Sequence, residues 1–237
     1  MPVPKGSEGY LMMATKHGLI KKTKLEEFVR IQSNGKIAIS LVDGDELIGV
    51  QLTKGGQDIL MASSGGKCIR FSEDDVRPTG RTSQGVRSIR LDDGEQVVDM
   101  TIVKDGCEAL TITQNGYGKR TDISEYRRQG RAGGGVKVGA LNDKTGGVVN
   151  LKLVDPENDD VIIISDNGVI IRVRAGEISK MSRNTQGVKV MRIKDGNSKV
   201  VAFTVVPHSE EESEDLADAP QTEATDTAEG VAETTEE

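Results

Sequence analysis

The sequence predicts an all-β fold with about four propeller-like blades of four strands each, followed by a disordered acidic tail. Three observations support this prediction. Glycines recur in two registered series, short apolar runs of strand length keep the same register, and acidic residues collect at the C-terminus. Repeats of about 50 residues built from short strands are typical of propeller blades.

The two glycine series divide the chain into repeats. Spacings are 48 to 52 residues in the first series and 50 to 52 residues in the second. The first comprises Gly18, Gly66, Gly116 and Gly168, and the second comprises Gly35, Gly85, Gly135 and Gly187. We therefore expect repeat units at about residues 9–57, 58–107, 108–158 and 159–209, with residues 210–237 as the tail.

Each unit is predicted to contain two β-hairpins. The first turns at a first-series glycine, because pairs such as Asn115-Gly116 suit the positive φ of tight turns. Its leading strands are Leu11–Ala14, Ile59–Ala62, Ala109–Ile112 and Val161–Ile164. The second begins at a second-series glycine, turns at pairs such as Asp43-Gly44 and returns through Leu47–Leu52, Val97–Ile102, Val148–Leu153 and Val200–Val205.

An apolar residue stands ten positions after each first-series glycine, in the long connection between the hairpins. These residues are Phe28, Val76, Tyr126 and Ile178. We expect them to hold the connection onto the core. Because Tyr126 is replaced by Phe, Val or Ile in the other units, we interpret it as a packing residue rather than a nucleophile.

Charge is distributed unevenly along the chain. The net charge is −7, but residues 210–237 hold twelve Asp and Glu and no Lys or Arg. The remaining 26 acidic and 31 basic residues give Met1–Ser209 a charge of +5. The tail also lacks aromatic residues, a composition typical of disorder. A basic body with an acidic tail favours a polyanionic partner for the body.

Lys and Arg residues keep the register of the glycines. One series stands four positions after the first-series glycine. Two more stand four positions before and two positions after the second-series glycine. A fourth series follows the apolar residue of the connection. The first unit departs twice, with Ile31 in the series before the second glycine and Lys36 one position early. The candidate DNA-binding residues are Lys22, Arg30, Lys36, Arg70, Arg77, Arg81, Arg87, Arg120, Arg127, Arg128, Arg131, Lys137, Arg172, Lys180, Arg183 and Lys189.

These registered cations predict a stripe along one edge of the repeats. Such a stripe matches the regular phosphates of a nucleic acid, although outward cations also serve solubility. Three Phe, three Tyr and no Trp disfavour single-strand binding by stacking. No recognition helix or zinc finger is visible, so the pattern favours duplex DNA held by its backbone and bent along the stripe.

The sequence does not support several other classes of protein, namely enzymes, metal-binding proteins and membrane or secreted proteins. Gly116-Tyr-Gly-Lys-Arg leads into a predicted strand, unlike a Walker A loop, and no nucleophile has a histidine partner. The two histidines lie far from other ligand residues, so we expect no metal site. No signal peptide or membrane span is visible, and the two cysteines suit a reducing cytoplasm. We expect no catalytic residue in this chain.

Three segments closely resemble the C-terminal domain of the A subunit of bacterial DNA gyrase. They are GKIAISLVDGDELIGV (35–50), QNGYGKRT (114–121) and RNTQGV (183–188). The resemblance runs from about Gly9 to Val206 and continues into the acidic tail. It implies a β-pinwheel, in which neighbouring blades exchange strands and the basic rim wraps duplex DNA. That wrapping supports ATP-dependent negative supercoiling by the whole enzyme.

The resemblance also implies partners and limits. The partners would be the rest of the A subunit, together with the B subunit, in an A2B2 complex in the nucleoid of a bacterial cytoplasm, with ATP and Mg²⁺ used outside this chain. The family's box, QRRGGKG, lies in its first blade, whereas this chain resembles later blades. Arg127–Gly135 (RRQGRAGGG) is at best a degenerate relative of that box. The alternatives are the C-terminal domain of the corresponding topoisomerase IV subunit, or a protein-interaction propeller.

Overall fold

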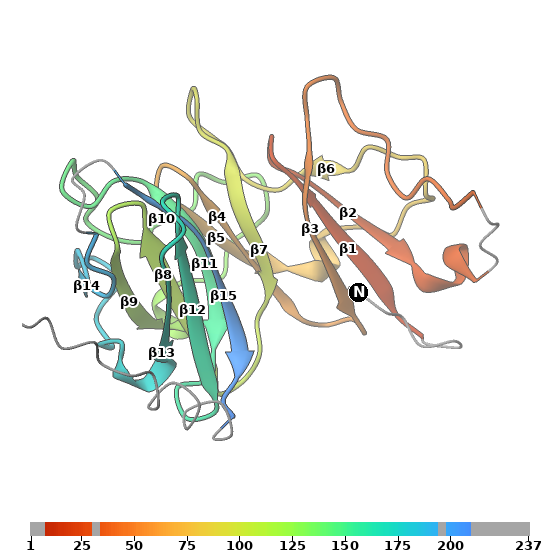
Figure 1. Cartoon of the computed structure of the whole chain (residues 1–237). Helices are drawn as coiled ribbons and strands as arrows, with labels where there is room; N and C mark the ends of the chain where they lie inside the picture. The colour runs from red at the N-terminus through yellow and green to blue at the C-terminus, as the bar shows by residue number, and fades with distance from the viewer. Residues whose placement is uncertain (1–7, 30–33, 194–197, 210–237) are drawn as a thin grey trace, which may run out of the picture. The chain divides into compact units, whose positions relative to one another are not determined.

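The computed structural model describes residues 8–29, 34–193 and 198–209. These ranges form fifteen β-strands and four short 3-10 helices, and the strands make four antiparallel sheets (Figure 1). The all-β prediction is therefore confirmed. The compact unit ends at Pro207. The predicted acidic tail, candidate residue Arg30 and the turn at Asp195-Gly196 lie outside the described residues.

The strands within each sheet follow one order that begins at the inner return strand, and in the first three sheets it ends at a short outer strand. The first sheet contains β3 (Leu47–Thr53), β1 (Tyr10–Thr15), β2 (Leu19–Lys24) and β6 (Val86–Arg87). The second contains β7 (Val97–Ile102), β4 (Asp58–Ser63), β5 (Lys67–Ser72) and β10 (Val136–Lys137). The third contains β11 (Val148–Val154), β8 (Glu108–Thr113), β9 (Tyr117–Asp122) and β14 (Val188–Lys189), and the fourth β15 (Val200–Pro207), β12 (Asp159–Ser165) and β13 (Ile170–Arg174).

The first predicted hairpin is confirmed in all four units. It pairs β1 with β2, β4 with β5, β8 with β9 and β12 with β13. Each return strand then pairs with the leading strand of the same unit, as Met13 does with Val50. A 3-10 helix follows each hairpin: η1 (Leu25–Phe28), η2 (Glu73–Asp75), η3 (Ile123–Glu125) and η4 (Ala175–Glu177).

The second predicted hairpin is wrong. The strand after a second-series glycine pairs with the preceding unit rather than with its own return strand, so Val86 of β6 lies opposite Ile20 of β2. β10 pairs in the same way with β5, and β14 with β9. The residues after Gly35 form no strand. This pairing is the strand exchange that the family resemblance implies.

The fourth sheet has three strands among the described residues, one fewer than predicted. Its outer strand β13 begins at Ile170, a residue that is 61% exposed. Ile20 and Cys68 stand at the equivalent positions of the first and second sheets, where β6 and β10 cover them, and both are fully buried. Strand exchange therefore decides how well the outer strand of each sheet is buried.

The described residues form three hydrophobic cores, each from residues of two successive sheets. In the first core Met12 packs with Met61, in the second Leu60 packs with Ala109, and in the third Leu110 packs with Phe203. The expected packing residues Val76, Tyr126 and Ile178 are buried in these cores, one in each, whereas Phe28 is half-buried. The connections therefore close the cores between blades, as predicted for three of the four units.

Candidate nucleic-acid interface

The candidate cations lie where each unit crosses onto the preceding sheet. After its 3-10 helix the chain runs beside the second strand of the previous unit, with the backbone N–H groups of Thr79, Gln129 and Met181 donating to carbonyls on that strand. It then turns and returns as β6, β10 or β14. Each junction thus presents a crossing loop and a two-residue strand at the outer edge of the preceding sheet.

The series four positions after the first glycine is buried or half-buried and paired inside the protein. The guanidinium Nε of Arg70 lies 2.8 Å from Asp58 Oδ2, Arg120 Nη1 lies 2.5 Å from Glu108 Oε2, and Arg172 Nε lies 2.7 Å from Asp160 Oδ2. Lys22 stands at the same position in the first unit, where its Nζ lies 3.5 Å from Glu73 Oε1 and 4.4 Å from the ring centroid of Tyr10. The three arginine pairs lie within one blade, whereas the contact of Lys22 with Glu73 joins two blades.

Arg70 and Arg120 also bind the next unit. Arg120 donates from Nε to the carbonyl oxygen of Ile178 at 2.6 Å and from Nη2 to that of Gly176 at 3.0 Å. Arg70 donates from Nη1 to the carbonyl oxygens of Ile123 and Tyr126. Their guanidinium donors are therefore largely used within the protein, to hold the 3-10 helix of the following blade.

Sequence reasoning missed the acidic partners of this series, although a signal was present. Asp58, Glu108 and Asp160 each stand twelve positions before the arginine that they bind. Across a hairpin this spacing brings the two side chains close on the same face, because residues two apart share a face. Arg and acid appear together in three units, and Lys and Tyr replace them together in the first.

The series four positions before the second glycine links successive junctions. Arg81, Arg131 and Arg183 each donate from Nη1 to the carbonyl oxygen of the residue two positions after the preceding unit's second glycine, namely Ile37 at 3.0 Å, Arg87 at 3.0 Å and Lys137 at 2.5 Å. A backbone bond repeats beside them, from Ser40 to Ser83, Arg90 to Gly133 and Ala140 to Thr185. Neighbouring crossing loops are thus held in a fixed relation.

Arg131 of this series and most of the remaining candidates are exposed. Arg77, Arg87, Arg127, Arg128, Arg131, Lys137, Lys180 and Lys189 are all exposed, and we call them the edge cations. Some also contact the protein: Lys180 Nζ lies 2.7 Å from Glu108 Oε1, and Lys189 donates to the carbonyl oxygen of Asn115 at 2.7 Å. Lys36 is half-buried and donates to the carbonyl oxygen of Glu27.

Local contacts keep charged side chains ionised at this edge. The backbone N–H and hydroxyl of Ser124, together with Lys180, lower the pKa of Asp122 to about 2. Glu108 and Asp122 in turn raise the pKa of Lys180. An exposed Lys144 lies 5.7 Å from the ring centroid of Tyr117, beside Lys189 at 4.8 Å, and sequence reasoning missed it because it has no registered equivalent.

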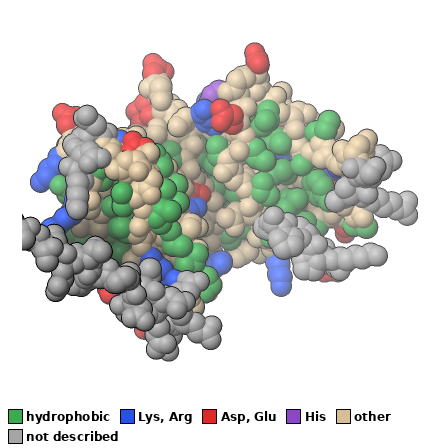
Figure 2. Space-filling view, in the orientation of Figure 1, with side chains coloured by type: hydrophobic (Ala, Val, Ile, Leu, Met, Phe, Trp, Pro, Cys, Tyr) green, Lys and Arg blue, Asp and Glu red, His purple; other side chains and the backbone are tan. Residues whose placement is uncertain are grey.

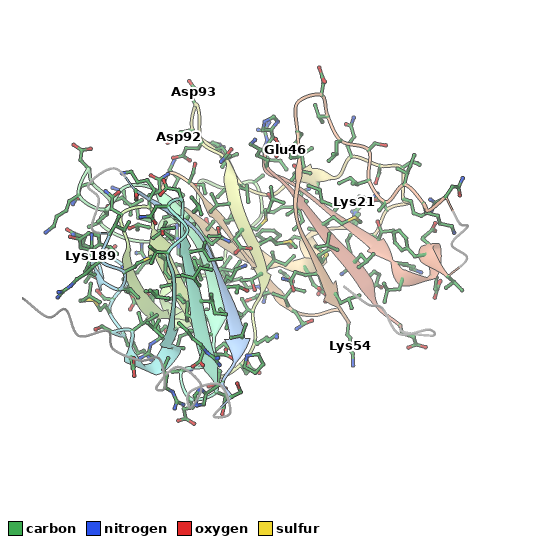
Figure 3. All side chains as sticks on the ribbon, viewed as in Figure 1. Lys21, Glu46, Lys54, Asp92, Asp93 and Lys189 are labelled. Carbon is green, nitrogen blue, oxygen red and sulfur yellow. The ribbon has the colours of Figure 1, made fainter. Side chains whose placement is uncertain are left out.

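Acidic side chains gather elsewhere. Figure 2 shows them at the tips of the two protruding loops, and Figure 3 labels Asp92 and Asp93 on the tip that precedes β7. Asp43 is likewise exposed in the loop that precedes β3. Lys189, by contrast, is labelled on β14 (Figure 3). Exposed acids thus mark the loops before β3 and β7, whereas the edge cations lie on the outer strands and crossing loops.

Catalytic geometry is not apparent in the described part of the chain. No group of three or more His, Cys, Asp or Glu in residues 8–29, 34–193 and 198–209 could hold a metal ion. Tyr126 is fully buried, and burial raises the pKa of its hydroxyl. Its interpretation as a packing residue is confirmed. Within these ranges, none of the helices has the length and apolar sequence that a membrane-spanning helix requires.

Comparisons with known proteins agree with this fold. Residues 9–54, 57–104, 108–155 and 159–207 match the family described as DNA gyrase C-terminal domain, beta-propeller. The DNA gyrase A subunit of Clostridium acetobutylicum is 45% identical over 212 residues, which are 90% of this chain and 25% of the relative. The gyrase A subunit of Escherichia coli K12 is 41% identical over 227 residues, or 95% of this chain and 26% of the relative. The chain thus spans about a quarter of the length of these curated relatives.

Solved structures show the same architecture. A DNA gyrase A C-terminal domain superposes with a TM-score of 0.75 at 26% identity, covering 84% of this chain and 66% of the other. A C-terminal domain of DNA topoisomerase IV superposes with a TM-score of 0.81 at 21% identity, covering 87% of this chain and 65% of the other, a likeness that concerns the fold alone. With its four matched repeats and its high identity to gyrase A subunits, this chain belongs to the DNA gyrase C-terminal domain family.

Proposed function

We propose that this chain binds duplex DNA along the edge cations and bends it, as the DNA-wrapping part of a gyrase A subunit. One observation carries the proposal: exposed cations recur on three successive junctions, on loops and strands that backbone hydrogen bonds hold in register. Regularly placed cations neutralise successive phosphates and release condensed counterions. They specify no base sequence, so sequence dependence would come from how easily the DNA deforms.

The half-buried arginines that follow the first-series glycines have a different part in this proposal. Arg70, Arg120 and Arg172 already bind carboxylates, and Arg70 and Arg120 also bind carbonyls of the next blade. They support the edge by holding blades together, whereas the edge cations contact phosphates. Arg81 and Arg183 are half-buried and lie in crossing loops. Each therefore has both roles: it holds neighbouring units together and adds positive charge at the edge.

A salt series with matched variants tests the proposal. Fluorescence anisotropy with labelled duplex DNA should show affinity that falls steeply as salt rises. The variant R87A/K137A, which removes two edge cations, should lower the slope of log affinity against log salt by about 2. The matched control K54A/K104A removes the same charge from two exposed lysines that follow the inner strands β3 and β7, and its slope should stay near wild type. R131A alone should weaken binding only modestly.

Bending needs a separate readout. Nicked plasmid ligated in the presence of the chain and then deproteinised should shift in linking number, and R87A/K137A should reduce the shift. Absence of binding at low salt, or binding unaffected by salt, contradicts the proposal and favours a protein-interaction propeller. Binding without a linking-number shift limits the function to DNA binding.

The wider context follows from the relatives and is part of the proposal. Because its relatives are A subunits of DNA gyrase, the chain would act within an A2B2 gyrase assembly that also contains the rest of the A subunit, together with the B subunit. ATP and Mg²⁺ would serve other parts of that enzyme, which introduces negative supercoils in a bacterial cytoplasm. The sequence identity to gyrase favours this assignment over topoisomerase IV.

A further inference from the structure

Two lysines outside the candidate set are buried in the sheets. Lys21 on β2 is 1% exposed and Lys119 on β9 is 3% exposed. Both stand three positions after a first-series glycine, where the second and fourth units have Ile69 and Ile171. A buried ammonium group is tolerated only where hydrogen-bond acceptors replace its lost hydration, so the partners of these lysines show what their burial achieves.

Lys119 is held by the main chain of one loop. Its Nζ donates to the carbonyl oxygens of Ser182 at 2.9 Å, Arg183 at 2.5 Å and Thr185 at 2.7 Å. This is the crossing loop of the fourth unit, and its Arg183 donates onward to the carbonyl oxygen of Lys137. A single ammonium group thus fixes three carbonyls of the segment that carries a candidate cation.

Lys21 shares one of these contacts at the first junction. Its Nζ donates to the carbonyl oxygen of Arg81, in the crossing loop of the second unit, and to that of Ala38 at 2.7 Å. Figure 3 labels Lys21 on β2, and Arg81 itself donates to the carbonyl oxygen of Ile37. Each lysine therefore donates to the carbonyl oxygen of the arginine in its crossing loop, Arg81 or Arg183, two units apart.

At the junction between these two, the crossing loop of the third unit is held on the second sheet without a lysine. Here Ile69 stands at the lysine position, and the loop is the glycine-rich Arg127–Gly135. Ala132 adopts a left-handed φ of 64°, and its N–H donates to the carbonyl oxygen of Ser88 at 2.6 Å. A Cβ on Gly133 would lie 3.6 Å from Ile69 Cδ1, so the glycine-rich loop packs directly onto the isoleucine. The crossing loop is therefore held in one of two ways. A lysine donates hydrogen bonds to its carbonyls, or an isoleucine packs against its glycine-rich backbone.

We infer that Lys21 and Lys119 are positioning residues, which place the loops of Arg81 and Arg183 on the DNA-facing edge without contacting DNA themselves. This inference rests on the proposed function for its DNA-binding consequence. The hydrogen bonds to carbonyls offset the unfavourable environment only in part: burial, with a further contribution from Arg183, lowers the pKa of Lys119 to about 8, although Glu125 acts in the opposite direction. Burial likewise lowers the pKa of Lys21.

A double-mutant cycle tests the inference. K119M keeps the length of the side chain but removes its donors, and it should weaken duplex binding about fivefold, with R183A giving a similar loss. The double variant K119M/R183A should bind no more weakly than the weaker single variant, because both changes act through the same loop. K189A is the matched control: Lys189 is exposed outside the loop, so its effect should add to that of K119M.

Hydrogen exchange supplies a readout without DNA. Amides of residues 182–187 should exchange faster in K119M than in wild type, with β8 and β9 unchanged. K119I, which carries the residue of the second and fourth units, and the cycle of K21M with R81A repeat the test if K119M fails to fold. Additive losses for K119M and R183A, or unchanged exchange at 182–187, overturn the inference. If wild type binds no DNA, the proposed function fails, whereas the exchange result still decides the role of Lys119.

Discussion

At the scale of single residues, a registered position does not define a role. Lys119 and Arg120 are adjacent on β9, yet Lys119 binds carbonyls of a crossing loop, whereas Arg120 binds Glu108 and the next 3-10 helix. Alternation along a strand sends neighbouring side chains to opposite faces, so adjacent cations meet different partners. The acceptors within reach decide whether a lysine or arginine is structural or exposed to a ligand.

Replacing Arg120 should test its structural role. R120L should lower the free energy of unfolding by about 3 kcal/mol, because it removes the donor to Oε2 of buried Glu108, whose other oxygen binds Lys180, and the donors to the carbonyls of Gly176 and Ile178. R127L, which removes an exposed edge cation, should change stability by less than about 0.5 kcal/mol. Urea unfolding followed by circular dichroism measures both. Similar stability of the two variants would show that the Arg120 contacts contribute little.

At the scale of elements, glycine permits strand exchange. β6, β10 and β14 have two residues each and follow Gly85, Gly135 and Gly187, all with positive φ. A Cβ on Gly135 would lie 2.5 Å from the carbonyl oxygen of Cys68 on β5. Only a residue without a side chain lets the crossing segment approach the preceding sheet this closely.

A pair of alanine substitutions separates close approach from backbone strain. Gly135 and Gly44 have φ values of 70° and 75°, but a Cβ on Gly44 would meet nothing within 4 Å. G44A should therefore lower the free energy of unfolding by about 1 kcal/mol through strain alone. G135A should cost about 2 kcal/mol more and speed amide exchange in β5 and at Val138. Equal effects on stability would show that close approach at Gly135 is unimportant.

At the scale of the whole molecule, the repeats and the acidic C-terminal stretch have net charges of opposite sign. Residues 210–237 carry twelve negative charges, whereas the preceding residues carry +5. A tethered polyanion competes with DNA phosphates for the same cations, and its effective concentration is high because it is covalently attached.

Deleting Glu210–Glu237 should therefore tighten duplex binding. The gain should be severalfold at low salt and should fade as salt screens the competition. Replacing the twelve acids with Ser and Gln should reproduce the gain, whereas a scrambled tail of the same composition should keep wild-type affinity. Anisotropy titrations across a salt series measure this, and unchanged or weaker binding after deletion rejects the competition.

Local features of the chain could be predicted from its sequence, whereas contacts between distant segments could not. The fold class, the first hairpins, the return strands and the packing of Val76, Tyr126 and Ile178 follow from patterns within about 50 residues. The second hairpin could not be predicted correctly, because Val86 of β6 pairs with Ile20 across 66 residues. The twelve-residue spacing of Arg and acid was visible in the sequence, whereas the carbonyl partners of Lys21 and Lys119 were not.

The sequence by itself determined the repeated hairpins and the register of the cations, because alternation and glycine turns are local properties of the chain. Only the tertiary structure decided which strand completes each sheet and which cations remain exposed. Strands of two residues carry too little pattern to specify a partner, and burial of a cation depends on acceptors that another unit supplies. For Arg127–Gly135, folding places a glycine-rich loop against Ile69 and leaves Arg127, Arg128 and Arg131 exposed at the edge of the preceding sheet.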